Sequence, residues 1–171
     1  MITLVFGSRP ARAHVEGHMP DSVAEMEYRI LLEFKPDDYA SRVKLATVLM
    51  NQEKLAEAEK EFNRVRAAAP RNLPAQLGLS RLRAKQHRTD EALKIIEKAV
   101  ALAPDKPAVY LCYGAILAAA NRLPEARVMY GKGLASLAAK AEDPEATDIR
   151  EELEKALKEL ADKLTKNQSV N

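Results

Sequence analysis

Apolar residues recur at helical spacing in the middle of the chain. Ala92, Ile96 and Ala99 lie three or four residues apart, which places them on one face of a helix. Pro104 follows this stretch, and a proline can neither donate the next helical hydrogen bond nor leave its predecessor in helical geometry. The pattern therefore predicts a helix that ends just before Pro104.

A second helix is predicted directly after this proline. Asp105 can cap a helix N-terminus, and Pro107 is tolerated in the first helical turn. Tyr110, Tyr113 and Leu117 then give a second apolar face at helical spacing. This part of the chain is therefore expected to form a helix, a tight turn and another helix.

The same helix–turn–helix pattern recurs every 34 residues. Four series hold this spacing: Ala24, Ala58, Ala92 and Ala126; Tyr28, Phe62, Ile96 and Tyr130; Leu31, Val65, Ala99 and Gly133; and Pro36, Pro70 and Pro104. Two antiparallel helices approach closely only where a side chain is small, and larger side chains one turn away fill the remaining space. Because one helix pair cannot bury both of its faces, the repeats are expected to stack.

A 34-residue period of paired helices is the signature of the tetratricopeptide repeat (TPR) family, which the chain resembles over roughly residues 21–138. Apolar and then small residues fill the packing positions of that family's first helix: Leu45, Leu79 and Tyr113, followed by Ala46, Ser80 and Gly114. The resemblance implies an all-α fold, a TPR-type helical-hairpin solenoid of about three repeats. An N-terminal extra helix and a C-terminal capping helix would flank the repeats.

The expected organisation follows the chain in order. We predict a disordered arm at residues 1–20, a partial-repeat helix at 21–36, three repeats at 37–140, a capping helix at 141–166 and a frayed tail at 167–171. Repeat helices are expected at about Asp38–Asn51, Leu55–Ala69, Pro74–Gln86 and Asp90–Ala103. Ser22 and Glu25 have the spacing of a capping box for the first helix. Ala138 replaces the closing proline of the third repeat, so that helix is free to continue.

Residues 1–20 do not fit the repeat. Ile2–Phe6 form a short apolar run, and Ala11-Arg12-Ala13 has the small-x-small form of a signal-peptidase site. Three interpretations stay open: the end of a secretory signal, a cloning leader suggested by Gly17-His18-Met19, or a plain disordered arm. The first would make the protein periplasmic or secreted, and otherwise we expect it in the cytoplasm.

The last predicted helix begins after Asp143 and Pro144, which supply a cap and a first-turn proline. Its apolar face holds Ile149, Leu153, Leu157, Leu160 and Leu164, and its other face holds the pairs Glu151–Lys155, Glu154–Lys158 and Glu159–Lys163. A polar-backed terminal helix of this kind keeps a repeat stack soluble. Partner binding through a coiled coil is the alternative, although the stretch is shorter than three heptads.

Composition and the absence of sequence motifs argue against several classes of function. The chain of 171 residues has a net charge of +2, which argues against a global attraction to nucleic acid or membrane. Neither a glycine-rich phosphate loop, a serine-centred elbow nor a zinc-protease motif occurs. The single Cys112 excludes an internal disulfide, and we expect it to be a small core or groove residue. We therefore predict a protein that is not an enzyme and uses no cofactor.

One cluster resembles a metal site. His14, Glu16, His18 and Met19 place two imidazoles, a carboxylate and a thioether close together, which could hold copper or zinc. The segment offers no surrounding side chains to orient these ligands, so we predict no metal site here. A secreted metal-binding protein that uses this arm is kept as a further alternative.

Basic residues dominate one segment. Residues 62–89 contain no acid, and Arg81, Lys85 and Arg88 share a helical face by their spacing. A solvated face explains this pattern as well as an acidic protein partner does. Nucleic acid fits less well, because stacking needs aromatic residues and residues 63–109 contain none.

The TPR resemblance also implies where a partner binds, because the first helix of each repeat lines a concave groove in that family. The lining residues would be Val43, Thr47, Met50, Leu77, Arg81, Lys85, Leu111, Ala115 and Ala119. Family members that clamp a peptide's terminal carboxylates use Lys, Asn and Arg at set groove positions. Here those positions hold Val43, Thr47, Gly78, Ala108 and Cys112, so the clamp is absent.

The sequence thus predicts a protein–protein interaction module, a scaffold or assembly factor that holds an acidic partner peptide or helix in its groove. Self-association into an oligomer, through the groove or the terminal helix, is the alternative function.

One residue departs from the family pattern. Arg83 sits where a large apolar residue is preferred, and its stem is expected to lie along the surface with its head in water.

Overall fold

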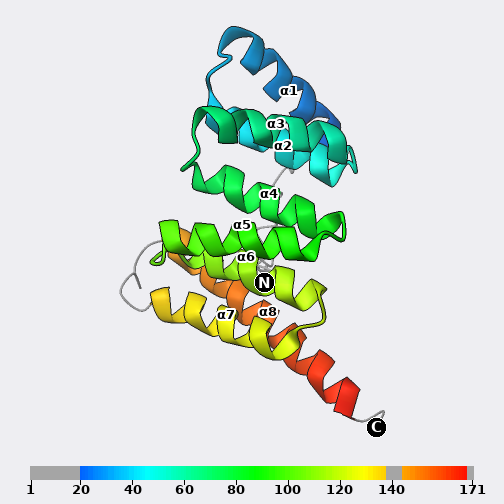
Figure 1. The fold of residues 1–171 in the computed structure, drawn as a ribbon, viewed down its shortest axis with the longest axis vertical. Coiled ribbons are helices and arrows are strands. Elements are labelled where there is room, and N and C mark those ends of the chain that lie inside the picture. The colour runs from blue at the N-terminus through cyan, green and yellow to red at the C-terminus, as the bar shows by residue number, and fades with distance from the viewer. Residues whose placement is uncertain (1–19, 138–143, 169–171) are drawn as a thin grey trace, which may run out of the picture.

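The computed structural model describes residues 20–137 and 144–168, and this part of the chain contains helices and no strand. Its helices are α1 (Asp21–Phe34), α2 (Tyr39–Asn51), α3 (Leu55–Ala68), α4 (Leu73–Lys85), α5 (Thr89–Leu102), α6 (Pro107–Ala119), α7 (Leu123–Leu137) and α8 (Pro144–Gln168). They stack into one elongated array with α1 at one end and α8 at the other (Figure 1).

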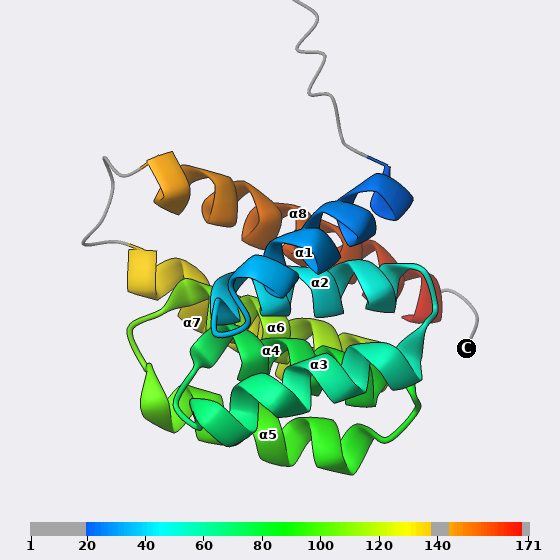
Figure 2. The same ribbon diagram turned by 90° about the horizontal axis from the view of Figure 1, so that it is seen from above.

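Successive helices pack as hairpins. α2 contacts α3, α4 contacts α5 and α6 contacts α7, while further contacts join α2 to α4 and α4 to α6. α8 contacts both α7 and α6, which is the place that the first helix of another hairpin would occupy (Figures 1 and 2). The predicted all-α, TPR-type solenoid with an extra helix at each end is confirmed.

The small residues of the period lie where the helices cross. Ala58, Ala92 and Ala126 have 0% of their surface exposed. Phe62 and Ile96, one turn further along the second helices, are also completely buried. Tight crossings with large neighbours are the physical origin of the 34-residue period.

Enlarging one of these crossings is expected to destabilise the stack. An Ala92→Leu substitution adds methylenes at a site with no free surface, so it should lower the free energy of unfolding by about 1–3 kcal/mol. Urea unfolding followed by circular dichroism measures this loss. An unchanged midpoint would show that Ala92 is not at a close crossing.

Each hairpin turn uses a residue in the left-handed region. The three residues are Glu53 (φ 60°), His87 (φ 60°) and Asn121 (φ 59°), and they lie one repeat apart. At the second turn the His87 N–H donates to the Ala84 carbonyl at 3.0 Å, and the Arg88 N–H donates to the Arg83 carbonyl at 2.9 Å. This is the Schellman arrangement, which closes the end of a helix.

His87→Gly is expected to stabilise the protein. A left-handed backbone costs an ordinary L-residue about 1–2 kcal/mol, and glycine avoids this cost but loses more entropy on folding. The net gain should be about 0.5–1 kcal/mol in the free energy of unfolding. Thermal melting of the variant beside an Asn121→Ala control, which should melt lower, checks this; equal or lower stability of His87→Gly would contradict it.

One recurring hydrogen bond was not predicted from the sequence. Arg42, Gln76 and Tyr110 occupy the same place in successive repeats, and each donates to the carbonyl of the preceding turn proline: Pro36, Pro70 and Pro104 respectively. Three chemically different side chains therefore perform one task, which is to fix each first helix to the turn before it.

The capping predictions are corrected in two places. Asp38 and Asn72 cap α2 and α4, accepting from backbone N–H groups at 3.2 and 3.0 Å. Within the described residues the α1 N-terminus has no side-chain cap, because the N-cap residue is Pro20 and Ser22 lies inside the first turn; Glu25 forms ion pairs instead of a capping box. Asp105 does not cap α6, whose N-cap lies one residue later and has no side-chain hydrogen bond.

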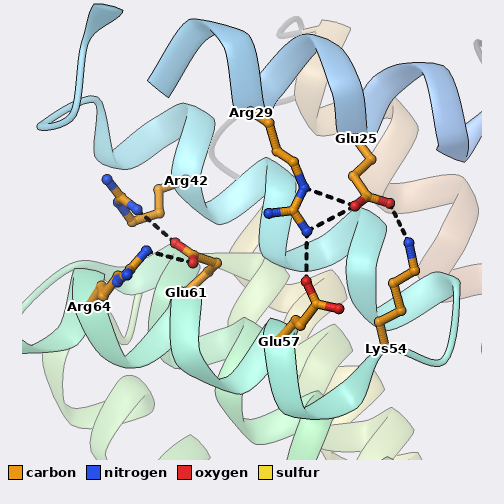
Figure 3. A network of polar contacts seen from close by, with 7 residues as sticks. All are labelled: Glu25, Arg29, Arg42, Lys54, Glu57, Glu61 and Arg64. Atoms are coloured by element: carbon orange, nitrogen blue, oxygen red, sulfur yellow. Dashed lines mark hydrogen bonds and ion pairs between the residues drawn. The ribbon is translucent and has the colours of Figure 1, made fainter. Parts of the chain in front are cut away.

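Ion pairs hold α1 against α3. Arg29 lies 2.9 Å from Glu25 on its own helix and 2.7 Å from Glu57 of α3, and Glu25 also meets Lys54 at 2.7 Å (Figure 3). These charges are partly exposed, so each pair adds little stability by itself. Together they fix which face of α1 is turned toward the stack.

Glu61 belongs to a second, more buried group. Its carboxylate meets Arg42 of α2 at 2.6 Å and Arg64 of α3 at 2.7 Å, and only 9% of its side chain is exposed (Figure 3). The sequence alone predicts an ordinary exposed surface pair for Glu61, which lies at helix spacing from Glu57 and Lys54, and the structure shows that this prediction is wrong. Burial here is tolerated because two cations satisfy one carboxylate.

The terminal helix packs as a cap. Leu153 and Leu160 of α8 are 0% and 3% exposed, so its apolar face is turned into the stack. Among the ion pairs of the described residues, the predicted Glu–Lys pairs of α8 do not occur. The predictions about the arm, the Ala138 position, the Asp143 cap and the last three residues lie outside the described residues.

Candidate functional site

A hollow of about 230 Å³ opens between α2 and α4. Its lining residues are Val43, Thr47, Met50, Pro74, Leu77, Gly78 and Arg81. Five of these belong to the predicted groove, and Pro74 and Gly78 were not predicted as lining. The structure therefore brings five of the six predicted groove residues of the first two repeats together in one concave surface, and Lys85 is the exception.

Gly78 shapes the floor of this hollow. A Cβ atom added at Gly78 would lie 2.2 Å from Cε1 of Phe62, whose ring is fully buried. Only glycine therefore allows the α3 aromatic ring to lie directly under α4. The missing side chain at Gly78 therefore makes room for the Phe62 ring, so that α3 and α4 pack closely beneath the hollow.

Charge is sparse and of one sign in this hollow. Arg81 is exposed and, within the described part of the chain, has no hydrogen bond or ion pair. The Thr47 hydroxyl donates to the Val43 carbonyl at 2.9 Å, so it is already satisfied. The hollow thus combines an apolar wall with a single available guanidinium, a group suited to binding a carboxylate.

The other two cations of the predicted basic face, Lys85 and Arg88, form ion pairs within the protein. Lys85 meets Glu53 at 2.6 Å, and Arg88 forms two hydrogen bonds of 2.7 Å with Glu91. Lys85 does not line the hollow. The basic face expected from Arg81, Lys85 and Arg88 is therefore reduced to Arg81.

Arg83 holds three helices together behind the hollow. Its guanidinium donates two hydrogen bonds to Glu59 of α3, at 2.6 and 2.7 Å, and lies 3.4 Å from Glu91 of α5. It also donates to the side chain of Gln86 at 2.8 Å. The expectation that its head lies in water is wrong, because only 9% of the Arg83 side chain is exposed.

This pairing changes the acidity of Glu59. The hydrogen bonds from Arg83 stabilise the carboxylate and lower the pKa of Glu59 from 4.5 to about 2. Burial opposes the shift but is the smaller effect. Glu59 therefore stays ionised across the ordinary pH range.

The third repeat does not extend the open groove. Ala115 and Ala119 line a separate hollow of about 270 Å³, together with Ala118, Tyr130, Ala156, Glu159, Leu160 and Lys163. Half of this wall comes from α8, so the terminal helix closes one side. Leu111 is half-buried against the hydrophobic core. Burial, and to a smaller extent the charge of Glu159, raise the pKa of Tyr130.

Two further features concern metal-binding groups and membrane-spanning helices among the described residues. The described residues contain no group of three His, Cys, Asp or Glu side chains that could hold a metal ion. None of the described helices has both the length and the hydropathy that crossing a bilayer requires. The cluster around His14 and His18 lies outside the described residues.

Stacked helical hairpins with a concave face define a helical-repeat solenoid. Two family models, each described as tetratricopeptide repeat, match residues 43–107 and 83–145. The chain belongs to the tetratricopeptide repeat family. A comparison of its sequence with curated proteins gave no match.

Solved structures share this fold. A thermophilic TPR protein of Thermus thermophilus has a TM-score of 0.71 at 19% identity, over 84% of this chain and 74% of that one. The type III secretion translocator chaperone SycD of Yersinia enterocolitica has a TM-score of 0.62 at 20% identity, over 76% and 95%. MamA of Desulfovibrio magneticus has a TM-score of 0.55 at 19% identity, and the match covers 87% of this chain and 84% of that one.

At these identities the likeness establishes the fold alone. The fold is that of a protein–protein interaction scaffold, which implies protein partners, and TPR proteins are generally not catalysts. Which surface binds, and what it binds, has to be argued from the residues of this chain.

Proposed function

We propose that this protein holds a segment of a partner protein in the hollow between α2 and α4, with a partner carboxylate on Arg81. The observation that carries the proposal is the guanidinium of Arg81, which lines an apolar, concave surface and has no ion-pair partner among the described residues. No acidic residue lines this hollow, so nothing within it competes for the cation.

The size of the hollow favours a peptide side chain over a whole small molecule. At about 230 Å³ it is smaller than the roughly 300–1,000 Å³ typical of small-molecule sites. Val43, Met50 and Leu77 supply apolar contact for one or two side chains of the partner. The partner sequence is therefore expected to place an acidic residue beside a Leu, Met or Phe.

Selection from a displayed library of random peptides tests this proposal. The wild-type protein should enrich peptides that carry Asp or Glu next to a large apolar residue, and their binding should weaken as salt is raised. Arg81→Glu should reduce the affinity for those peptides at least tenfold, because a carboxylate then faces a carboxylate.

The matched control is Arg66→Glu. Arg66 lies in the last turn of α3, is exposed, and does not line the hollow. Its substitution makes the same change in net charge, so it should leave the selected peptides bound at wild-type strength. Equal binding by Arg81→Glu and wild type would exclude the hollow as the site.

A further inference from the structure

α1 exposes an apolar stripe. Val23, Met26, Ile30 and Phe34 are 42%, 58%, 49% and 79% exposed, and they recur at helical spacing along the whole helix. Across the described residues only Val128 is a further large hydrophobic residue with comparable exposure. Exposed apolar residues are thus concentrated on one face of one helix, at the end of the stack (Figure 1).

The repeat shows that this face is unusual. The same positions in the second helices of the three hairpins are held by Glu57, Glu91 and Glu125; by Lys60, Lys94 and Val128; and by Arg64, Lys98 and Lys132. All of these residues are exposed, so in α3, α5 and α7 this is the outward face. Where the other helices place charges toward water, α1 places Val23, Met26 and Ile30.

An outward face that is apolar in one helix and, apart from Val128, charged in its three counterparts indicates an interface. Scattered single apolar residues are normal on a surface, but contiguous patches of roughly 300–600 Å² often mark interaction sites. The stripe cannot serve the internal packing of the stack, because Ala24 and Leu32 already supply the buried contacts of α1.

We propose that the stripe binds the α1 stripe of a second copy of this chain, with the two helices antiparallel across a two-fold axis. Antiparallel pairing centred on residue 28 sets Met26 opposite Ile30 and places Val23 within one residue of the position opposite Phe34. The smallest residue of the stripe then lies near the largest at both ends, which suits close packing.

The charges at the ends of α1 favour the same arrangement. Asp21 lies in the first turn and Lys35 at the C-cap, and within the described part of the chain neither forms an ion pair. In the antiparallel pair, Asp21 of each copy lies near Lys35 of the other. The two helix dipoles also oppose one another, which is favourable.

The expected dimer is weak. Two stripes of four residues bury less than the roughly 1,200 Å² of a stable interface, so a dissociation constant of about 1–100 μM is expected. Sedimentation equilibrium over about 1–300 μM should therefore show wild type changing from monomer to dimer. The double variant Met26→Lys, Ile30→Lys should stay monomeric with unchanged helicity.

Val128→Lys is the matched control, because Val128 occupies the same repeat position as Met26 and is 53% exposed. It should dimerise like the wild type. A dimer that survives Met26→Lys, Ile30→Lys, or that is lost equally in Val128→Lys, would overturn the proposed interface.

A charge exchange tests the antiparallel geometry. Asp21→Lys alone and Lys35→Asp alone each create two like-charge contacts in their own dimer, so both should dimerise at least tenfold more weakly than wild type. An equal mixture of the two variants restores two opposite-charge contacts and should recover the dimer. No recovery on mixing would overturn the antiparallel arrangement.

Other occupants of the stripe give distinct results. If residues 1–19 of the same chain cover it, the full chain should remain monomeric and only a chain starting at Pro20 should dimerise. If both chains stay monomeric across the concentration range, the face serves another partner. Either result overturns the proposal, whereas dimerisation of the full chain through Met26 and Ile30 supports it.

Discussion

Glu59→Gln is expected to lower the free energy of unfolding by about 2–3 kcal/mol at neutral pH. The substitution leaves Arg83 almost fully buried without its main counter-charge, and removal of one partner of a buried ion pair typically costs about 3–5 kcal/mol. The loss should be smaller than this typical value, because Glu91 remains 3.4 Å from Arg83 and the Glu59 side chain is 29% exposed. Urea unfolding at pH 7 measures it.

A double substitution provides the control. Arg83 occupies a position where TPR proteins prefer a large apolar residue, so Arg83→Leu combined with Glu59→Gln removes both charges and restores that pattern. Well-packed apolar residues can replace a buried ion pair without loss. The double variant should therefore be more stable than Glu59→Gln alone, and the opposite order would contradict a buried ion pair.

The pH dependence has a defined sign. The pKa of Glu59 is depressed from 4.5 to about 2 in the folded protein, so its contribution is fully present above pH 4.5. That contribution is lost as the pH falls toward 2 and the carboxylate becomes protonated. The stability difference between wild type and Glu59→Gln should therefore shrink over this acidic window, while a constant difference would exclude the pairing as its cause.

Phe62→Ala is expected to cost about 3–5 kcal/mol, the largest single effect. The ring is completely buried and fills the space under Gly78, so its removal leaves a cavity between α3 and α4. A large drop in the urea midpoint, with helical content retained in the native baseline, is the expected observation.

The neighbouring glycine supplies the compensating change. Gly78→Leu alone should also be destabilising, since its side chain would collide with the ring. Together, Gly78→Leu and Phe62→Ala should be less harmful than the sum of the two single changes. Simple additivity would show that the two positions do not share one packing site.

The period determined most of what could be predicted. Ala58, Ala92 and Ala126 identified the helix crossings because close helix packing restricts those positions to small side chains. A repeat can be recognised in a single sequence because the same residue pattern occurs in it several times. The resemblance to the TPR family then supplied the prediction that Val43, Thr47 and Leu77 line one concave surface.

Single features were harder to predict. Arg83 was expected to point to water because its partner, Glu59, lies on another helix at a distance set only by packing. Lys85 was expected to be available to a partner in the groove, but it pairs with Glu53 of another hairpin, and this contact too depends on how the helices pack. The second hollow could not be predicted either, because it depends on where α8 docks against α6.

Amide chemical-shift mapping with a selected acidic peptide tests the central claim most directly. The amides of Thr47, Leu77 and Arg81 should shift on addition of the peptide, and Arg81→Glu should abolish these shifts. The α1 residues Met26 and Ile30 should be unaffected. Shifts that instead cluster on α1 or along α8, and that persist in Arg81→Glu, would contradict partner binding in the hollow between α2 and α4.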